Sequence, residues 1–121
     1  MRYCKEHTWA KVEEGLVRVG ITDFAQGQLG DIIFIELPQV GEVFNQGEVF
    51  GQAESAKSVS SLYMPISGEI KYVNDNVEDS PDLVNTNPYD EGWIIIVKPR
   101  NFSEVSALLS EEGYTSLLEK S

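Results

Sequence analysis

One short stretch of the sequence places a reactive amine among small, uncharged neighbours. Lys57 stands in the segment ESAKSVS, residues 54–60, and is the only lysine between Val12 and Ile70. An enzyme can acylate a solvent-exposed amine without bulky neighbours, and a long arm attached there can swing freely. Such tethering raises the effective concentration of a carried group at successive active sites. Spacing alone favours the simpler interpretation, a solvated loop lysine.

The other candidates for chemistry are Cys4 and His7, each the only residue of its type. A zinc site usually needs three or four side-chain ligands, so these two residues cannot complete a Cys/His site. A cysteine nucleophile normally meets a histidine from a distant part of the chain, held by a third group. The carboxylates are many and spread out, and no acid and base pair can be singled out. We therefore expect no catalytic residue, no metal site and no enzyme activity.

Length and charge narrow the class of protein. At 121 residues the chain suits a single domain over residues 1–121. A formal charge of −11 with only nine Lys and Arg argues against a nucleic-acid partner. No apolar run approaches the roughly 20 residues of a membrane span, and the first residues lack a signal-peptide core. The single cysteine cannot form an internal disulfide, which fits a reducing compartment. Together these features predict a bacterial cytoplasmic protein, or a mitochondrial matrix protein if the chain is a processed eukaryotic one.

Apolar residues recur at period two, or in short unbroken runs between turn residues, as is typical of strands. The run at 32–37 is nearly continuous, which indicates a strand buried on both sides. Residues 48–54 and 58–64 would pair as a hairpin with Lys57 at its tip. A short helix is expected from Thr22 to Gly30, and two more near the C-terminus. The full set of expected strands is 16–21, 32–37, 48–54, 58–64, 69–73 and 93–97.

The order of these elements predicts a mainly β fold. Closely spaced strands, a few small helices and no βαβ rhythm indicate a flattened barrel or a sandwich of two antiparallel sheets. A weak repeat agrees with this architecture. Gly41-Glu42-Val43 and Gly68-Glu69-Ile70 each begin a strand after a turn, 27 residues apart, and hint at two similar halves.

Several separated segments resemble one family, the H protein of the glycine cleavage system. The similarity runs in the family's order through nearly the whole chain and is far more specific than the lysine alone. The matching residues are His7, Trp9, Gly20-Ile21-Thr22-Asp23, Ala25-Gln26, Leu29-Gly30-Asp31, Glu36-Leu37-Pro38, Val40-Gly41, Glu54-Ser55, Lys57, Pro65-Ile66-Ser67-Gly68-Glu69, Val73-Asn74, Leu83-Val84-Asn85, Pro88-Tyr89 and Glu91-Gly92-Trp93.

The resemblance implies a non-catalytic carrier with a barrel-sandwich hybrid fold related to lipoyl domains. Lipoic acid would be joined to Lys57 as an amide, and Glu54 and Ser55 would help the lipoylating enzyme, a lipoate ligase or a lipoyl/octanoyl transferase, to recognise the hairpin. The arm would take an aminomethyl group from a glycine decarboxylase (P protein), pass it to an aminomethyltransferase (T protein) and be reoxidised by dihydrolipoamide dehydrogenase (L protein). We expect a monomer that binds neither nucleic acid nor membrane.

Three positions near the arm depart from the family's pattern. Thr8 stands where a glutamate is common, Gln28 where a histidine is often found, and Ser61 where an acidic residue is usual. In the family these groups help to hold the aminomethylated arm in a cleft, and that role is not carried onto the three residues here. The departures motivate an alternative, a lipoyl carrier acting in cofactor relay outside glycine breakdown. A biotin carrier ranks lower because Ala56 and Ser58 flank the lysine in place of methionines.

Overall fold

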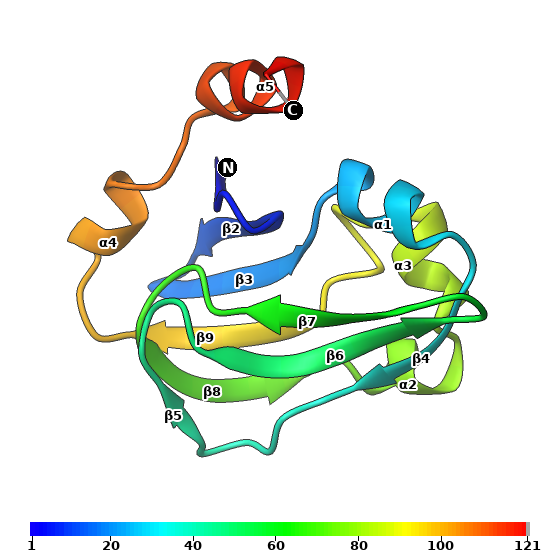
Figure 1. Ribbon diagram of the computed structural model, residues 1–121. Helices are drawn as coiled ribbons and strands as arrows, with labels where there is room; N and C mark the ends of the chain where they lie inside the picture. The colour runs from blue at the N-terminus through cyan, green and yellow to red at the C-terminus, as the bar shows by residue number, and fades with distance from the viewer. Residues whose placement is uncertain (121) are drawn as a thin grey trace.

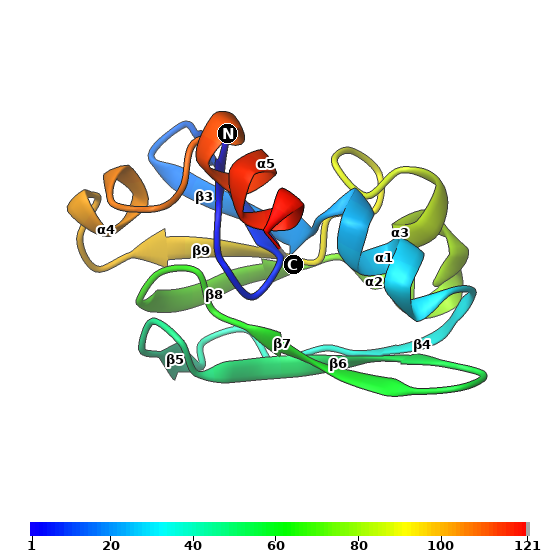
Figure 2. The same ribbon diagram turned by 45° about the horizontal axis from the view of Figure 1, so that its top comes forward.

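The computed structural model describes residues 1–120 and shows two antiparallel sheets and several short helices (Figures 1 and 2). The strands are β1 (Arg2–Tyr3), β2 (Thr8–Glu13), β3 (Leu16–Ile21), β4 (Ile32–Glu36), β5 (Val43–Phe44), β6 (Val49–Ser55), β7 (Val59–Tyr63), β8 (Gly68–Val73) and β9 (Ile95–Pro99). The helices are α1 (Asp23–Leu29), α2 (Asp75–Asp79), α3 (Asp82–Thr86), α4 (Ser103–Ser106) and α5 (Glu111–Glu119). The larger sheet has the order β1-β2-β3-β9-β8-β5 and the smaller the order β4-β6-β7, and within the described residues neither closes into a barrel.

A common apolar core unites the two sheets. In β3, Val17, Val19 and Ile21 are each at most 2% exposed. Val17 lies opposite Val97 and Val19 opposite Ile95, so these two strands present one continuous apolar face. The smaller sheet contributes Ile35, Ala53 and Leu62 to the same cluster. The expected mainly β fold of two antiparallel sheets, and the period-two strand at 16–21, are confirmed.

The expectation that residues 32–37 are buried on both sides is wrong. Strand β4 is an edge strand with β6 on one side only. Ile32 and Ile35 are buried, whereas Ile33 and Phe34 are 58% and 47% exposed. The register shifts between Ile32 and Phe34, and this irregularity places Ile33 and Phe34 both toward solvent. An unbroken apolar run cannot distinguish a central strand from an edge strand whose outer face is apolar.

Helix α1 begins and ends where the sequence predicts. The Thr22 hydroxyl accepts a hydrogen bond from the Ala25 N–H at 3.2 Å, and the helix ends at Gly30, whose φ is 81°.

Helices α2 and α3 have no counterpart among the sequence-based expectations. Each fully buries a single residue, Val77 in α2 and Val84 in α3. One buried residue per helix produces no 3.6-residue period to detect.

The two segments of the weak repeat lie side by side. Strands β5 and β8 pair antiparallel, with Val43 opposite Glu69 and Phe44 opposite Gly68. The Gly41 N–H donates to the Ile70 carbonyl at 2.8 Å. This pairing ties the chain that leads into β6, a strand of the smaller sheet, to the edge of the larger sheet.

A second apolar cluster joins the two ends of the chain, where α5 lies over the N-terminal strands (Figure 1). The rings of Tyr3 and Tyr114 stack with their centroids 4.9 Å apart. Trp9 is fully buried, and its indole N–H donates to the Pro88 carbonyl at 2.9 Å. Within residues 1–120, no helix combines the length and apolar character that crossing a membrane would require.

Candidate cofactor-attachment site

Ser55 closes the turn that presents Lys57. Its N–H donates to the Ser58 carbonyl at 2.8 Å, which ends the pairing of β6 with β7. Its side-chain oxygen accepts from the N–H groups of Lys57 and Ser58 at 3.4 and 3.2 Å. Because Ser55 is only 5% exposed, its hydroxyl is held in place by the surrounding structure. The buried serine therefore fixes the backbone on both sides of the lysine.

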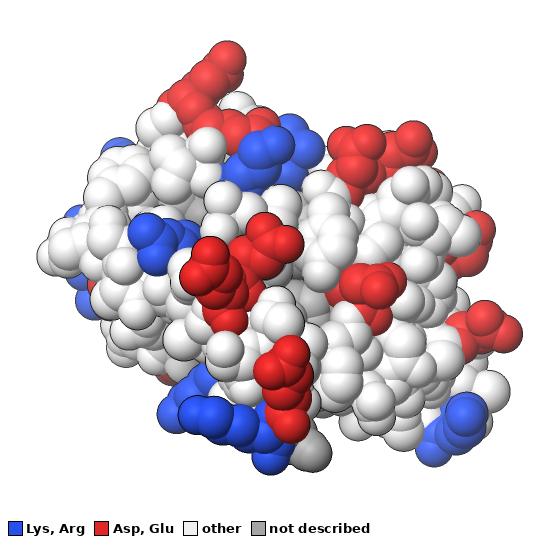
Figure 3. Space-filling model, turned by 90° about the horizontal axis from the view of Figure 1, so that it is seen from above, with Lys and Arg blue, Asp and Glu red and all other residues white. Residues whose placement is uncertain are grey.

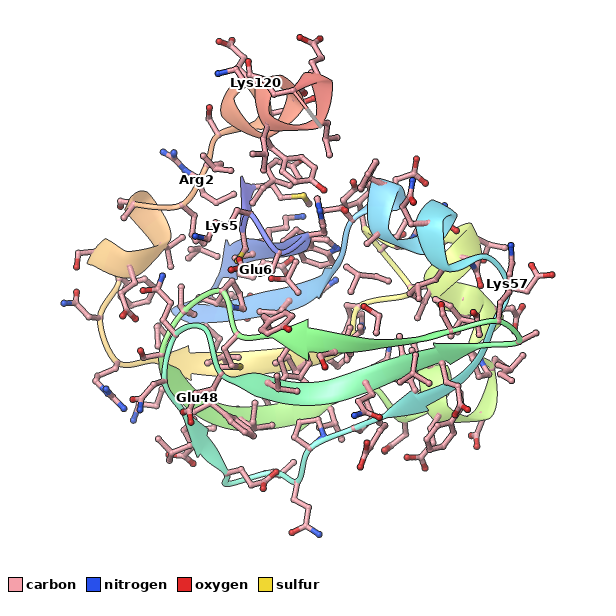
Figure 4. The ribbon with its side chains drawn as sticks, in the orientation of Figure 1. Arg2, Lys5, Glu6, Glu48, Lys57 and Lys120 are labelled. Atoms are coloured by element: carbon pink, nitrogen blue, oxygen red, sulfur yellow. The ribbon has the colours of Figure 1, made fainter. Side chains whose placement is uncertain are left out.

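The side chain of Lys57 extends from this turn toward solvent. It is exposed, and its amine makes no ion pair or hydrogen bond with any other residue of the described chain. Figure 4 places Lys57 at the tip of the hairpin, whereas Arg2 and Lys5 lie on the other side of the view and Lys120 lies at its top. The two chain neighbours of the lysine are small and exposed. An enzyme can therefore reach the amine without moving another side chain.

The turn between α1 and β4 lies beside the lysine. A methyl group on Gly30 would lie 3.7 Å from the Cε atom of Lys57. Asn85 of α3 holds this turn, because its Oδ1 accepts from the Ile32 N–H at 2.9 Å. Its amide group also donates to the Gly30 carbonyl at 2.9 Å and to Oε1 of Gln26 at 2.8 Å. Asn85 belongs to a segment that resembles the family, but sequence reasoning missed its contacts, whose partners lie 53 to 59 residues away.

Glu54 faces the side of the hairpin opposite to Ser55, since successive strand residues alternate between faces. Glu54 is half-buried and lies opposite Phe34 on β4 and Val59 on β7. Its carboxylate makes no ion pair or hydrogen bond within residues 1–120. The two residues expected to aid recognition thus differ in position. Glu54 is available to a cationic partner group, whereas Ser55 is buried and acts through the turn that it shapes.

Comparison with known proteins decides the family. The model of the glycine cleavage H-protein family matches residues 1–121. The chain belongs to this family. The glycine cleavage system H protein of Oceanobacillus iheyensis is 49% identical over 97% of this chain and 93% of its own length, and that of Geobacillus thermodenitrificans is 50% identical over 99% and 94%. A crystal structure of a glycine cleavage system H protein from Mycobacterium marinum has a TM-score of 0.89 and 39% identity, covering 97% of this chain and 94% of that one.

Membership of the H-protein family establishes the general role. The chain is a lipoyl carrier of the glycine cleavage system, and it is not itself an enzyme. Members of the family carry lipoate, and their partners are the P, T and L proteins of the system. The match over nearly the whole chain does not favour the alternative of a lipoyl relay outside glycine cleavage.

Neutral side chains occupy the three positions that depart from the usual H-protein pattern. Thr8 is 1% exposed, and its hydroxyl donates to the Tyr63 carbonyl at 3.1 Å. Gln28 is exposed on α1, and Ser61 is half-buried on β7. Thr8 thereby joins β2 of the larger sheet to the end of β7 in the smaller sheet. In this H protein, position 8 serves a structural contact.

Cys4 and His7 are both engaged by other groups. Cys4 is 9% exposed, and its thiol donates to Oε2 of Glu6 at 2.9 Å. Burial, followed by the hydrogen bond to Glu6, raises the pKa of the Cys4 thiol, which makes it a poor nucleophile. Nδ1 of His7 lies 2.7 Å from the Tyr114 hydroxyl. Across the described residues, no three Cys, His, Asp or Glu side chains come together in a way that could hold a metal ion.

Proposed function

We propose that the lipoyl group of this carrier is attached through an amide to Nζ of Lys57. The observation that carries the proposal is the exposed, unpaired amine at the tip of a turn that Ser55 holds in place. The surroundings fit a long arm, because the chain neighbours are small and Gly30 presents no side chain beside Cε. An attached arm can therefore leave the hairpin in several directions.

Attachment would use the lysine as the nucleophile. The Lys57 ammonium loses one proton, and Nζ attacks the carbonyl of an activated lipoyl group. The activating group leaves with its bonding electrons, and the nitrogen loses a second proton as the amide forms. This reaction removes the positive charge, so the arm can enter an enzyme cleft without the cost of burying an ammonium. A lipoate ligase or a lipoyl/octanoyl transferase would carry out the step.

The residues around the lysine position the arm and take no part in its chemistry. Ser55 fixes the turn, and Asn85 holds Gly30 beside it. When bound, the lipoyl group supplies the sulfur chemistry that accepts and releases the aminomethyl group. Tethering keeps the group at high effective concentration for the P, T and L proteins in turn. We propose that residues 1–121 act as one monomeric carrier domain in the bacterial cytoplasm. The bacterial origin of the relatives supports the bacterial setting.

The charge of the carrier limits the surfaces with which it can associate. Its formal charge is −11, and acidic side chains are spread over the face seen from above in Figure 3. Partner surfaces with excess positive charge are therefore favoured, and added salt should slow association.

Mass spectrometry of the intact chain and of its peptides tests the attachment. After incubation with lipoate ligase, lipoate and ATP, one lipoyl group is expected on the peptide that contains Lys57. Lys57→Arg keeps the positive charge and should remain unmodified. Lys98→Arg, at an exposed lysine of β9, is the matched control and should be modified like the wild type. A lipoyl group on another lysine, or none on folded protein with active ligase, would contradict the proposal.

A further inference from the structure

The outer face of the smaller sheet carries a row of side chains next to the lysine turn. In the strand register, Glu54 lies between Phe34 on β4 and Val59 on β7. Residues directly opposite one another in a sheet share a face, so these three side chains form one row, the Phe34–Glu54–Val59 row. The next register position, which includes Ile35 and Ala53, faces the core, where both residues are fully buried.

The apolar members of this row are unusually open. Phe34 and Val59 are 47% and 57% exposed, and Ile33 at the irregular position of β4 is 58% exposed beside them. Their exposure leaves this face of the smaller sheet open to solvent, and β4 is an edge strand of that sheet. Exposed apolar residues on an edge strand favour aggregation unless a function retains them. Glu54 adds a carboxylate that forms no ion pair with a lysine or arginine of residues 1–120.

We propose that the Phe34–Glu54–Val59 row is the surface on which the enzyme that acylates Lys57 docks. The inference rests on the proposed attachment at Lys57. The bare lysine is short, so an enzyme that takes its amine must contact the strands on either side of the turn. Enzymes that later receive the group can meet it at the end of a long arm, farther from these strands. The row therefore matches the acylating enzyme better than the P, T or L protein.

The chemistry of the row defines the complementary surface on that enzyme. Phe34 and Val59 require an apolar contact, and Glu54 requires a lysine or arginine between the two apolar positions. The position of the row also sets the side from which the enzyme approaches, because the row crosses the hairpin near its tip and lies on one face only. An enzyme bound there would have the Lys57 turn at one edge of its interface.

Initial-rate kinetics of lipoylation test the proposal on the whole chain. Phe34→Ser should raise the KM of lipoate ligase for the carrier by about tenfold and leave kcat nearly unchanged, since tenfold corresponds to about 1.4 kcal/mol of binding. Val59→Ser should act in the same direction. Val43→Ser is the matched control, because Val43 is 61% exposed on β5 of the other sheet. Its KM should equal that of the wild type.

The outcomes separate this inference from the attachment at Lys57. Wild-type protein that is lipoylated at Lys57, with Phe34→Ser and Val59→Ser modified at wild-type KM, would overturn the docking surface and leave the attachment intact. No modification of the wild type would overturn the attachment itself.

Sedimentation of the wild type and of Phe34→Ser tests the other occupant, a second copy of the chain. Self-association that disappears in Phe34→Ser while its KM stays at the wild-type value would assign the row to that contact and overturn the proposal.

Discussion

Nδ1 of His7 lies 2.7 Å from the hydroxyl of Tyr114, although 107 residues separate them in the chain. The same hydroxyl lies 2.7 Å from the Thr22 side-chain oxygen. Thr22 can donate to Tyr114 while Tyr114 donates to His7, and this arrangement requires an unprotonated Nδ1. The contact joins the last helix to the N-terminal strands, and its strength should depend on the charge of His7.

Acidification should therefore weaken the folded state through His7. Burial lowers the pKa of His7 below its ordinary value of 6.5, and the smaller effect of Glu6 opposes this shift. The unfolded chain then takes up the proton at a higher pH than the folded chain. The contribution of neutral His7 to stability is complete above the unfolded pKa and declines as the pH falls from there toward the folded pKa. Between about pH 7.5 and 5.5, Tm should fall more for the wild type than for His7→Gln. Equal decreases would contradict this role.

Gly30 should resist substitution because of its backbone conformation. Its φ of 81° and ψ of −155° lie in a region that residues with a Cβ atom rarely adopt. Gly30→Ala should lower the free energy of unfolding by about 1–3 kcal/mol in urea titrations. Gly27→Ala is the control, since a methyl group at Gly27 would meet nothing within 4 Å and the residue lies inside α1. It should stabilise the protein by up to about 1 kcal/mol, and a similar loss in both variants would refute the explanation.

Gly20 makes room for a buried indole. A methyl group on Gly20 would lie 2.7 Å from the ring of Trp9, which is fully buried and anchored to the Pro88 carbonyl. The ring cannot withdraw without breaking that hydrogen bond, so Gly20→Ala should cost at least about 1–3 kcal/mol of stability. Urea unfolding measures the loss, and near-UV circular dichroism reports whether the indole has moved. Wild-type stability with an unchanged spectrum would be inconsistent with this packing.

Asn85 should control the order of the turn beside the lysine. Asn85→Ala removes the group that accepts from the Ile32 N–H and the group that donates to the Gly30 carbonyl. The free energy of unfolding should fall by about 1–3 kcal/mol. Hydrogen exchange of the Ile32 amide should become faster. Asn87→Ala is the control, because the Asn87 side chain makes no hydrogen bond within the described chain. Unchanged exchange in Asn85→Ala would show that other contacts hold the turn.

Local patterns in the sequence predicted most strands and the position of the lysine. The expected pairing of 48–54 with 58–64 is found as β6 (49–55) paired with β7 (59–63), with Lys57 in the connection between them. These predictions hold because alternation and turn residues are local properties, set by which side of a strand faces the core. Strand β2 was not predicted, because its charged second half obscures the alternation.

Relationships between distant segments could not be predicted in this way. The exposure of Phe34 depends on the place of β4 at the edge of a sheet, and a run of apolar residues does not encode that place. The contacts of Asn85 with Gly30 and Ile32 require α3 to pack beside α1. Resemblance to the H-protein family identified the segment that contains Asn85, but only the fold shows what its side chain does.

Transfer of the aminomethyl group from labelled glycine is the decisive test of the carrier role. Carrier that is fully lipoylated at Lys57 is mixed with a glycine decarboxylase of the P-protein type and with glycine labelled at its α-carbon. We expect the label to become bound to the carrier, to map to the peptide of Lys57 and to be absent from Lys57→Arg. Fully lipoylated, folded carrier that takes up no label, while a characterised H protein does so with the same decarboxylase, would contradict it.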